Sequence, residues 1–251
     1  MRLRTLEVSI EGLPRELEGL RIAHLSDFHL GLPSRGTVAV ERAVEWTAER
    51  EPDLVCLSGD LLSRGSGEKR LRAVLARLPQ PCFAILGNHD FAVSRDPFSE
   101  RTNVQDLEPV SLLSDEGTRI ELRGRPVYIA GSDPRSRWLK RRKRPAELAV
   151  HDADLRILLC HYPQVIDALP ADAFDLVLAG HMHDGQISVP YPGGKLRLAH
   201  PTAPYTSGVY RRPGGVLHVS PGLGTTFVPF RFFARPEATE LVLRSGPTLE
   251  A

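Results

Sequence analysis

The chain has 251 residues, of which 41% are hydrophobic and 25% are charged, values that are ordinary for a soluble globular protein. This composition argues against a disordered, fibrous or membrane-embedded chain, and the length allows a sizeable core. The charges nearly balance, with 32 Lys and Arg residues against 31 Asp and Glu residues. Any attraction for nucleic acid or anionic membranes must therefore come from a local patch.

Cysteine usage and the first residues of the chain suggest a compartment. Cys56, Cys82 and Cys160 each lie in an apolar run typical of a buried strand, without C-x-x-C spacing, which predicts buried, reduced thiols. Residues 1–10 alternate charged and apolar residues and lack the continuous apolar stretch of a signal peptide or a spanning helix. We therefore expect a cytoplasmic protein, although a chain whose leader had been removed would look the same.

Apolar runs of strand length alternate with helical periodicity through the first half of the chain. Buried strands are predicted at residues 21–26, 54–58 and 82–86. A helical face containing Val40 and Val44 separates the first two strands. A second helical face, from Leu71 to Leu78, precedes the third strand and is ended by Pro79.

The second half of the chain is richer in strands. A hairpin is predicted at residues 119–122 and 126–130, and buried strands at 155–160 and 176–179, with a short helix at 164–169 between them. The part that follows residue 186 is β-like, with turns at residues 193–194 and 214–215. Since neither a repeat nor a linker divides residues 1–251, we predict one α+β domain of packed sheets flanked by helices.

Each of the five buried strands runs into residues that can bind metal. The carboxyl ends of strands are where open α/β sheets build their sites, and glycines before three of these residues permit close backbone turns. The residues concerned are Asp27, His29, Asp60, Asn88, His89, His161, His181 and His183. Oxygen and imidazole ligands without thiolate suit Mn²⁺, Fe or Zn²⁺. They are too many for one tetrahedral ion, which predicts two divalent ions that share a carboxylate and attract an anionic phosphate.

In this order, the motifs D-x-H, G-D, G-N-H-D, a lone His and G-H-x-H resemble those of the calcineurin-like metallophosphoesterases, in particular a bacterial phosphodiesterase branch. The resemblance implies a sandwich of two β-sheets flanked by helices in four layers. It also implies that one metal is held by Asp27, His29 and His183, that a second is held by Asn88, His161 and His181, and that Asp60 bridges them. His89 is implied to protonate the leaving oxygen, with Asp90 or Asp27 orienting it.

Two residues depart from the branch, and several histidines lie outside the motifs. Met182 and Asp184 stand where the branch has a small residue and Gly, so we expect different substrate contacts near Asp184. A lone histidine is more often a core or surface residue than a ligand. Of the four outside the motifs, His200 is the best site candidate, ahead of His24, His151 and His218.

Residues 135–144 contain seven Lys and Arg residues and form the clearest charge cluster. The simplest interpretation is a solvated loop or helix face. The alternative is a basic flap, anchored by Trp138 and Leu139, that contacts an anionic substrate or lipid headgroups and makes the protein peripheral to a membrane. We expect no specific nucleic-acid binding, because stacking positions and a long basic groove are missing.

The leading functional prediction is a phosphodiesterase that uses a metal-bridging hydroxide to attack phosphorus. The first alternative is a pyrophosphatase acting on a lipid-linked sugar nucleotide, similar to UDP-2,3-diacylglucosamine hydrolases. The second is a non-catalytic scaffold of the same fold. Scaffolds of this fold typically lose ligands or the His of G-N-H-D, whereas this chain retains them all.

Overall fold

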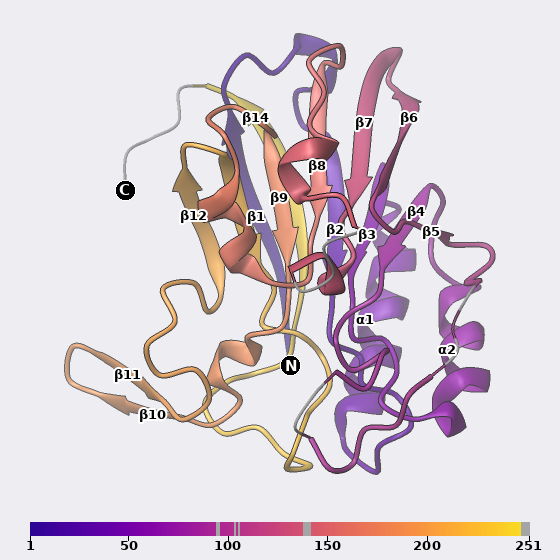
Figure 1. The fold of residues 1–251 in the computed structure, drawn as a ribbon, viewed down its shortest axis with the longest axis vertical. Coiled ribbons are helices and arrows are strands. Elements are labelled where there is room, and N and C mark those ends of the chain that lie inside the picture. The colour runs from indigo at the N-terminus through magenta and orange to yellow at the C-terminus, as the bar shows by residue number, and fades with distance from the viewer. Residues whose placement is uncertain (94–95, 103, 105, 138–141, 247–251) are drawn as a thin grey trace.

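The computed structural model describes residues 1–93, 96–102, 104, 106–137 and 142–246, and two mixed six-stranded sheets dominate it (Figure 1). The first sheet has the order β1-β14-β2-β3-β4-β5. Its strands are β1 (Arg2–Ile10), β2 (Arg21–Leu25), β3 (Leu54–Ser58), β4 (Cys82–Ile85), β5 (Ser111–Leu112) and β14 (Glu237–Ser245). Strands β2 to β5 are parallel, and β14 runs antiparallel to β2 and parallel to β1.

The second sheet has the order β12-β13-β9-β8-β7-β6. Its strands are β6 (Glu116–Leu122), β7 (Arg125–Gly131), β8 (Leu155–Leu159), β9 (Leu176–Ala179), β12 (Gly208–Arg212) and β13 (Gly215–Val219). The four inner strands are parallel, and the edge strands β6 and β12 close antiparallel hairpins. A separate two-stranded hairpin, β10 (Ser188–Tyr191) and β11 (Gly194–Arg197), extends from this part of the chain.

Alternation along the buried strands places one core between the sheets and another under the helices. On β3, Leu54 and Cys56 face the second sheet, whereas Val55 and Leu57 face α1 (Gly36–Arg50) and α2 (Glu68–Leu75). Val40 and Val44 of α1 pack in the same cluster as Val55 and Leu57. A buried strand with both faces covered has the continuous apolar sequence seen here.

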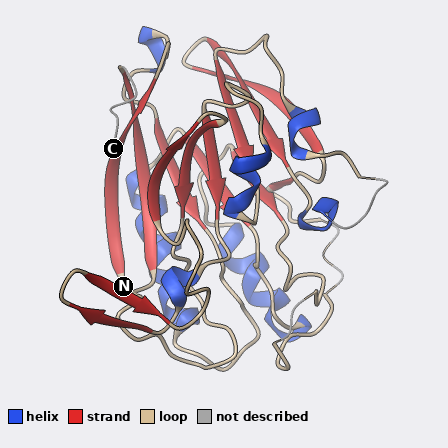
Figure 2. Cartoon of the chain, turned by 60° about the vertical axis from the view of Figure 1, so that its left-hand side comes forward, coloured by secondary structure: helices blue, strands red, loops and turns tan. Residues whose placement is uncertain are grey.

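Six short 3-10 helices lie in the described connections between the other elements, and some of them cover the outer face of the second sheet. They are η1 (Arg15–Leu17), η2 (Gly65–Gly67), η3 (Pro134–Arg137), η4 (Pro145–Leu148), η5 (Pro163–Ala168) and η6 (His183–Gly185). Figure 2 shows the sheets as two red layers with helices on their outer sides. The predicted two-sheet α+β sandwich is thus confirmed, with 3-10 turns in place of α-helices over the second sheet in the part of the chain that is described.

The predicted strands are confirmed, with bounds that differ by a few residues at most, and the hairpin predicted at residues 119–122 and 126–130 spans residues 116–131. The predicted second helix ends at Leu75 and continues only as a turn to Leu78, and the segment at 164–169 forms the 3-10 helix η5. The three cysteines are buried and free, as predicted. Among the described residues, none of the helices combines the length and apolar character that crossing a bilayer demands.

Candidate metal centre

The eight predicted site residues meet where the two sheets present the carboxyl ends of their strands. Asp27 and His29 follow β2, Asp60 follows β3, and Asn88 and His89 follow β4 in the first sheet. The second sheet contributes the remaining three, His161 after β8 and His181 and His183 after β9. Seven of the eight side chains belong to buried residues, and His181 is partly exposed. Two sheets thus converge on one site.

The backbone at this edge is strained in a way that regular strands are not. Asp27, His29, Asp60, His181 and His183 have φ between 48° and 72°, a region that residues other than glycine rarely adopt. Such conformations persist only where the surroundings determine them, and they cluster at functional sites. The adjoining glycines allow close packing, because a Cβ at position 180 would lie 2.6 Å from Asp27 Oδ2. The left-handed turns aim consecutive side chains into one space.

The first group of donors consists of Asp27, His29 and His183, whose ligand atoms lie within 4.8 Å of one another. The Nε2 atoms of His29 and His183 are 3.1 Å apart, and His183 Nε2 is 3.4 Å from Asp27 Oδ1. Two ligands that each lie about 2.1 Å from one ion are separated by about 3.0–3.4 Å at octahedral or tetrahedral angles. These three residues could therefore hold a metal ion.

The second group consists of Asp60, His161 and His181, again within 4.8 Å. Asn88 joins it, because its Oδ1 lies 3.0 Å from His161 Nε2. The ring of His181 packs edge-on against His161, with centroids 5.0 Å apart. This group also suits one divalent ion with oxygen and nitrogen ligands.

Asp60 connects the two groups. Its Oδ2 lies 3.2 Å from His161 Nε2 in the second group and 3.6 Å from His29 Nε2 in the first. Its other oxygen, Oδ1, accepts a hydrogen bond from the His89 backbone N–H at 2.8 Å. One carboxylate oxygen therefore faces both groups while the other fixes the orientation of the carboxylate.

Protonation equilibria reflect the crowding of buried carboxylates and imidazoles. Burial opposes ionisation of Asp27 and Asp60, but neighbouring histidines outweigh it and hold the pKa of each carboxyl below its usual range. Burial disfavours charge on His161, yet Asp60 raises the pKa of that imidazole to about 9. Burial lowers the pKa of His181 and of His29. Without metal, a proton on His161 compensates negative charge that a cation would otherwise neutralise.

Hydrogen bonds behind the rings set which nitrogen faces the centre. His161 Nδ1 lies 2.8 Å from the Ser58 carbonyl oxygen and must donate its proton to it, which leaves Nε2 unprotonated in the neutral ring. His29 Nδ1 lies 2.9 Å from Ser63 Oγ, which allows the same tautomer. Partners of this kind orient imidazole ligands in metal sites. In their neutral forms both rings can therefore present Nε2 to a metal, and a metal ion would replace the extra proton that Asp60 favours on His161.

Arg231 favours the other tautomer of His183, in which Nε2 carries the proton. Its Nη2 lies 2.8 Å from His183 Nδ1, and since a guanidinium only donates, Nδ1 accepts and the proton of the neutral ring is on Nε2. Metal binding through His183 Nε2 therefore requires Arg231 to withdraw from the ring. Sequence reasoning missed Arg231, whose only signal was an arginine among four phenylalanines.

His89 is positioned by residues that were not predicted. Its Nδ1 hydrogen-bonds to Ser99 Oγ and lies 4.0 Å from Asp96 Oδ2. Asp90, one of the two residues predicted to orient it, instead accepts hydrogen bonds from the backbone of Gly87, Leu61 and Leu62. Burial and nearby Asp60 raise the pKa of Asp90 to about 7. The prediction for Asp90 was wrong because its carboxyl group secures the loops that carry the site.

The four histidines outside the motifs lie in different surroundings. His200 is exposed beside the site, with its ring centroid 5.2 Å from that of His181, which agrees with its ranking as the best additional candidate. His24 and His218 are buried between the two sheets, with their Nδ1 atoms 2.7 Å apart. His151 is exposed. Asp184, predicted to alter substrate contacts, pairs with Lys195 and Arg197 of β11.

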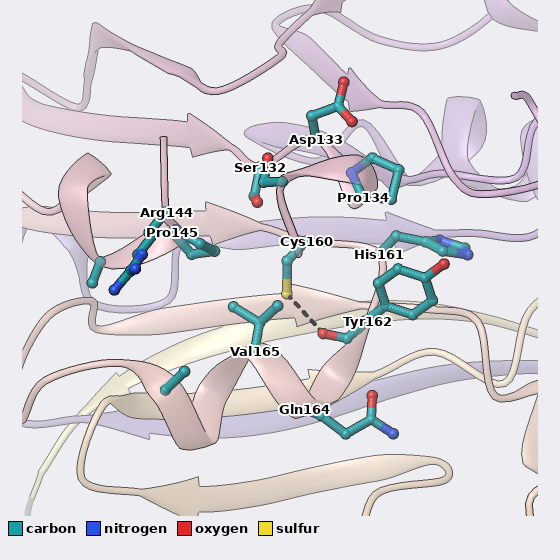
Figure 3. A pocket seen from close by; sticks show the side chains of 13 residues that line it. Ser132, Asp133, Pro134, Arg144, Pro145, Cys160, His161, Tyr162, Gln164 and Val165 are labelled. Atoms are coloured by element: carbon teal, nitrogen blue, oxygen red, sulfur yellow. Dashed lines mark hydrogen bonds between the residues drawn. The ribbon is translucent and has the colours of Figure 1, made fainter. Parts of the chain in front are cut away.

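A pocket of about 510 Å³ opens beside His161 (Figure 3). Its walls are mainly apolar, from η4, η5 and the end of β8, and include Pro145, Val165 and Cys160. Tyr162 lies next to His161 on one side, and Arg144 lies on the opposite side of the pocket. Cys160 points away from the metal centre into this wall, as strand alternation predicted.

The basic run at residues 135–144 falls partly outside the described residues, since 138–141 are not included. Arg135 pairs with Asp133 at 2.7 Å, and Arg142 pairs with Asp133 at 2.8 Å and with Asp115 at 3.1 Å. These ion pairs compensate part of the charge of the run.

Comparison with known proteins accords with this geometry. A profile of the family described as calcineurin-like phosphoesterase matches residues 20–185, which include all eight site residues. The chain belongs to this family. One relative is metallophosphoesterase YkoQ of Bacillus subtilis, which is 29% identical over 91% of this chain and 85% of that protein.

Two further relatives have names that specify an activity. Phosphodiesterase YaeI of Escherichia coli is 28% identical over 81% of this chain and 75% of its own length. UDP-2,3-diacylglucosamine pyrophosphatase LpxG of Chlamydia muridarum is 27% identical over 88% of this chain and 82% of its own length. A phosphoester hydrolase that uses divalent metals is the activity that the family and the donor clusters support together.

Proposed function

We propose that this protein is a binuclear metal-dependent phosphodiesterase. The observation that carries the proposal is the position of Asp60, one of whose oxygens faces both donor groups at 3.2 and 3.6 Å. In the proposed centre, Asp27, His29 and His183 bind one metal, and Asn88, His161 and His181 bind the other. Asp60 bridges the two.

The donor set favours Mn²⁺, with Fe or Zn²⁺ as alternatives, because it combines carboxylate, amide and imidazole without thiolate. Two divalent ions would supply, when bound, polarisation of a phosphoryl oxygen and a nucleophile derived from water at neutral pH. Asp27 and Asp60 leave the centre with net positive charge, which favours an anionic phosphate ester. The burial of these ligands keeps the electrostatic attraction strong.

His89 is the proposed proton donor to the leaving oxygen. Its ring packs edge-on against His29, with centroids 4.7 Å apart, so it lies at the first donor group without being needed as a ligand. Ser99 holds its Nδ1 and thereby orients Nε2. A positioned proton donor of this kind contributes roughly 10²–10⁴ in rate.

The pocket beside His161 supports a diester with one apolar arm. Its mainly apolar walls would bury that arm, and Arg144 on the far side could meet a polar or anionic group. The same features support the alternative substrate, a lipid-linked sugar nucleotide cleaved at its pyrophosphate, which the name of the LpxG relative also suggests. We retain contact between the 135–144 run and substrate as a proposal, centred on Arg144.

The proposal can be tested by hydrolysis of bis(p-nitrophenyl) phosphate. The protein is first stripped of metal and then titrated with Mn²⁺. Turnover should appear with added metal and should exceed that of p-nitrophenyl phosphate, the monoester. Cleavage of UDP-2,3-diacylglucosamine without turnover of diesters would favour the pyrophosphatase instead. Failure to hydrolyse any of these with Mn²⁺, Fe²⁺ or Zn²⁺ would favour the non-catalytic scaffold.

A further inference from the structure

The β10–β11 hairpin turns an apolar face away from the protein. Val189 and Leu196 are cross-strand partners, and Tyr191 and Leu198 lie two residues from them on the same face. All four side chains are exposed, by 44% to 57%. An isolated two-stranded hairpin is marginal on its own, so another contact must hold it.

The opposite face of the hairpin provides that contact. Lys195 Nζ and Arg197 Nε each lie 3.0 Å from an oxygen of Asp184, and Lys195 also donates to the Phe233 carbonyl oxygen. Polar side chains thus bind the hairpin to the protein while its apolar side chains face outward. This polarity is the reverse of that in a strand that contributes to a core.

A second apolar segment lies directly beside the hairpin. The loop at residues 225–233 contains Phe227, Phe230, Phe232 and Phe233, and all four are about half exposed. It is joined to the hairpin where the Ser188 N–H donates to the Phe232 carbonyl oxygen at 2.8 Å. Figure 1 shows the hairpin and this loop at the end of the molecule toward which β8 and β9 point. We call the eight exposed side chains of the hairpin and the loop the aromatic face.

Arginines border the aromatic face where it adjoins α1. Residues 185–236 contain six cations and no Asp or Glu, but Lys195 and Arg197 are paired with Asp184, and Arg211 and Arg212 lie on β12. Arg35 and Arg42, at the start of α1 and within it, line a groove together with Phe230. Arg64 lines a pocket of about 350 Å³ together with Phe227 and is paired with Glu100 at 3.6 Å. Exposed apolar patches of this extent mark interaction surfaces, and aromatic rings bordered by arginines match the headgroup region of an anionic bilayer.

The same charge argues against a second copy as the occupant. In a symmetric dimer each face meets its own copy, so the arginines that border the face would oppose one another. An anionic lipid surface instead complements them. We propose that the aromatic face docks on an anionic lipid bilayer.

Docking would place the metal centre close to the bilayer surface. Arg231, between Phe230 and Phe232, donates to the backbone carbonyl oxygens of His183 and Pro221. The Phe227 N–H donates to Asp96 Oδ2 at 3.1 Å. The loop of the aromatic face is therefore hydrogen-bonded to the wall of the site. This inference concerns location and holds whichever ester is hydrolysed.

Sedimentation with large vesicles, either of phosphatidylcholine alone or with phosphatidylglycerol added, tests the proposal. Wild-type protein should sediment with the anionic vesicles. The variants Phe230→Ser/Phe233→Ser and Tyr191→Ser/Leu196→Ser should each bind about tenfold more weakly, since they remove apolar burial in the bilayer. Leu3→Ser, on edge strand β1, removes an equally exposed apolar side chain and should bind as wild type does.

A charge arm separates lipid docking from general stickiness. Arg35→Glu/Arg42→Glu should weaken binding to anionic vesicles, as should raised salt, because headgroup attraction is screened. Arg119→Glu/Arg123→Glu, at β6 and the turn that follows it, reverses the same number of charges and should leave binding unchanged. Equal binding of wild type and all variants to both kinds of vesicle would overturn the proposal.

Tryptophan fluorescence tests the same proposal without the serine variants, and therefore applies even if one of them fails to fold. Phe230→Trp should gain emission that brominated phosphatidylcholine in anionic vesicles quenches, whereas Leu3→Trp should not. Absence of quenching would overturn the proposal. So would a wild-type dimer in sedimentation velocity that ignores vesicles and dissociates in Phe230→Ser/Phe233→Ser, because the face would then be a self-association surface.

Discussion

The carboxylate of Asp60 uses one oxygen for the backbone and the other for both donor groups, and this division makes its replacement informative. Asn at this position can still accept the His89 N–H through Oδ1, so the loop should be preserved. A neutral amide is a poor bridge between two cations that repel. Asp60→Asn should therefore lower metal content below that of wild type and reduce turnover by roughly 10²-fold or more, as even outer-sphere changes cost 10–100-fold.

Elemental analysis of purified Asp60→Asn protein, together with its rate on bis(p-nitrophenyl) phosphate, checks this. Asp27→Asn serves as comparison, because its carboxylate belongs to the first group alone and should affect mainly one metal. Full metal content with normal turnover in Asp60→Asn would remove the bridge from the account.

His89 allows chemistry to be separated from metal binding. His89→Asn should keep the metal content of wild type and lose roughly 10²–10⁴ in rate on alkyl phosphodiesters. The loss should shrink for nitrophenyl esters, because their leaving groups need little protonation. An equal loss on both kinds of ester would mean that His89 binds phosphate and does not act as an acid.

Ser99 provides a check on how His89 is held. The hydroxyl bonds to Nδ1 of the ring, so Ser99→Ala should leave metal content unchanged and reduce the rate on alkyl esters more than on nitrophenyl esters. Thr5→Val, which removes a hydroxyl bonded to Glu240 where β1 pairs with β14, is the control. If Ser99→Ala lost rate equally on both esters, a structural role for Ser99 would explain the result better.

Residue types at strand ends could be predicted, whereas their supporting partners could not. Asp27 and His183 belong to short motifs that directly follow buried strands. Such motifs are local patterns and can be recognised from sequence alone. Arg231 reaches His183 across 48 positions, and Asp96 and Ser99 contact His89 from a loop. Such contacts depend on how loops pack, which local sequence patterns do not encode.

At the scale of one element, the β10–β11 hairpin gives Asp184 a structural role. This residue is one of the two departures from the bacterial branch noted in the sequence. Asp184, in a left-handed conformation with φ of 47°, binds Lys195, Arg197 and Ser207. Its side chain is 7% exposed, so the ion pairs are partly shielded from water. Asp184→Ala should therefore release the hairpin from the protein.

Limited trypsin digestion measures that release, because trypsin cleaves after Lys195 and Arg197. Cleavage there, located by mass spectrometry, should be faster in Asp184→Ala than in wild type. Asp152→Ala, which breaks an exposed ion pair with Arg119 on β6, should leave the hairpin's cleavage unchanged. Equal cleavage rates in all three proteins would show that Asp184 does not anchor the hairpin.

Element boundaries followed from sequence where the signal was local. β3 agrees with its prediction at both ends, because its residues are all buried and flanked by turns. The parallel pairing of β1 with β14 joins the two ends of the chain, from Arg2 opposite Glu237 onward. This pairing could not be predicted from the sequence, because partners separated by more than 200 residues share no local pattern.

At the scale of the whole molecule, two buried histidines link the sheets and make stability depend on pH. Burial lowers the pKa of His218 to about 3, and burial together with His218 lowers the pKa of His24. Below pH about 6.5 the unfolded chain binds protons that the folded chain excludes. The free energy of unfolding should therefore decrease on acidification, by about 1.4 kcal/mol per pH unit for each histidine.

Urea unfolding of metal-free protein at about pH 7 and pH 5 measures this contribution. The double variant His24→Leu/His218→Leu should lose less stability between these two pH values than wild type does. His151→Leu removes an exposed histidine and should retain the wild-type difference. If the double variant also retained it, other groups would account for the acid sensitivity.

The central claim is that the two sheets together hold two metal ions, one on each side of Asp60. Anomalous X-ray diffraction from crystals grown with Mn²⁺ tests it most directly. The account predicts two anomalous peaks about 3.5–4 Å apart. One should lie among Asp27, His29 and His183, and the other among Asn88, His161 and His181. A single peak, or none at these residues under saturating Mn²⁺, Fe²⁺ or Zn²⁺, would contradict the binuclear centre.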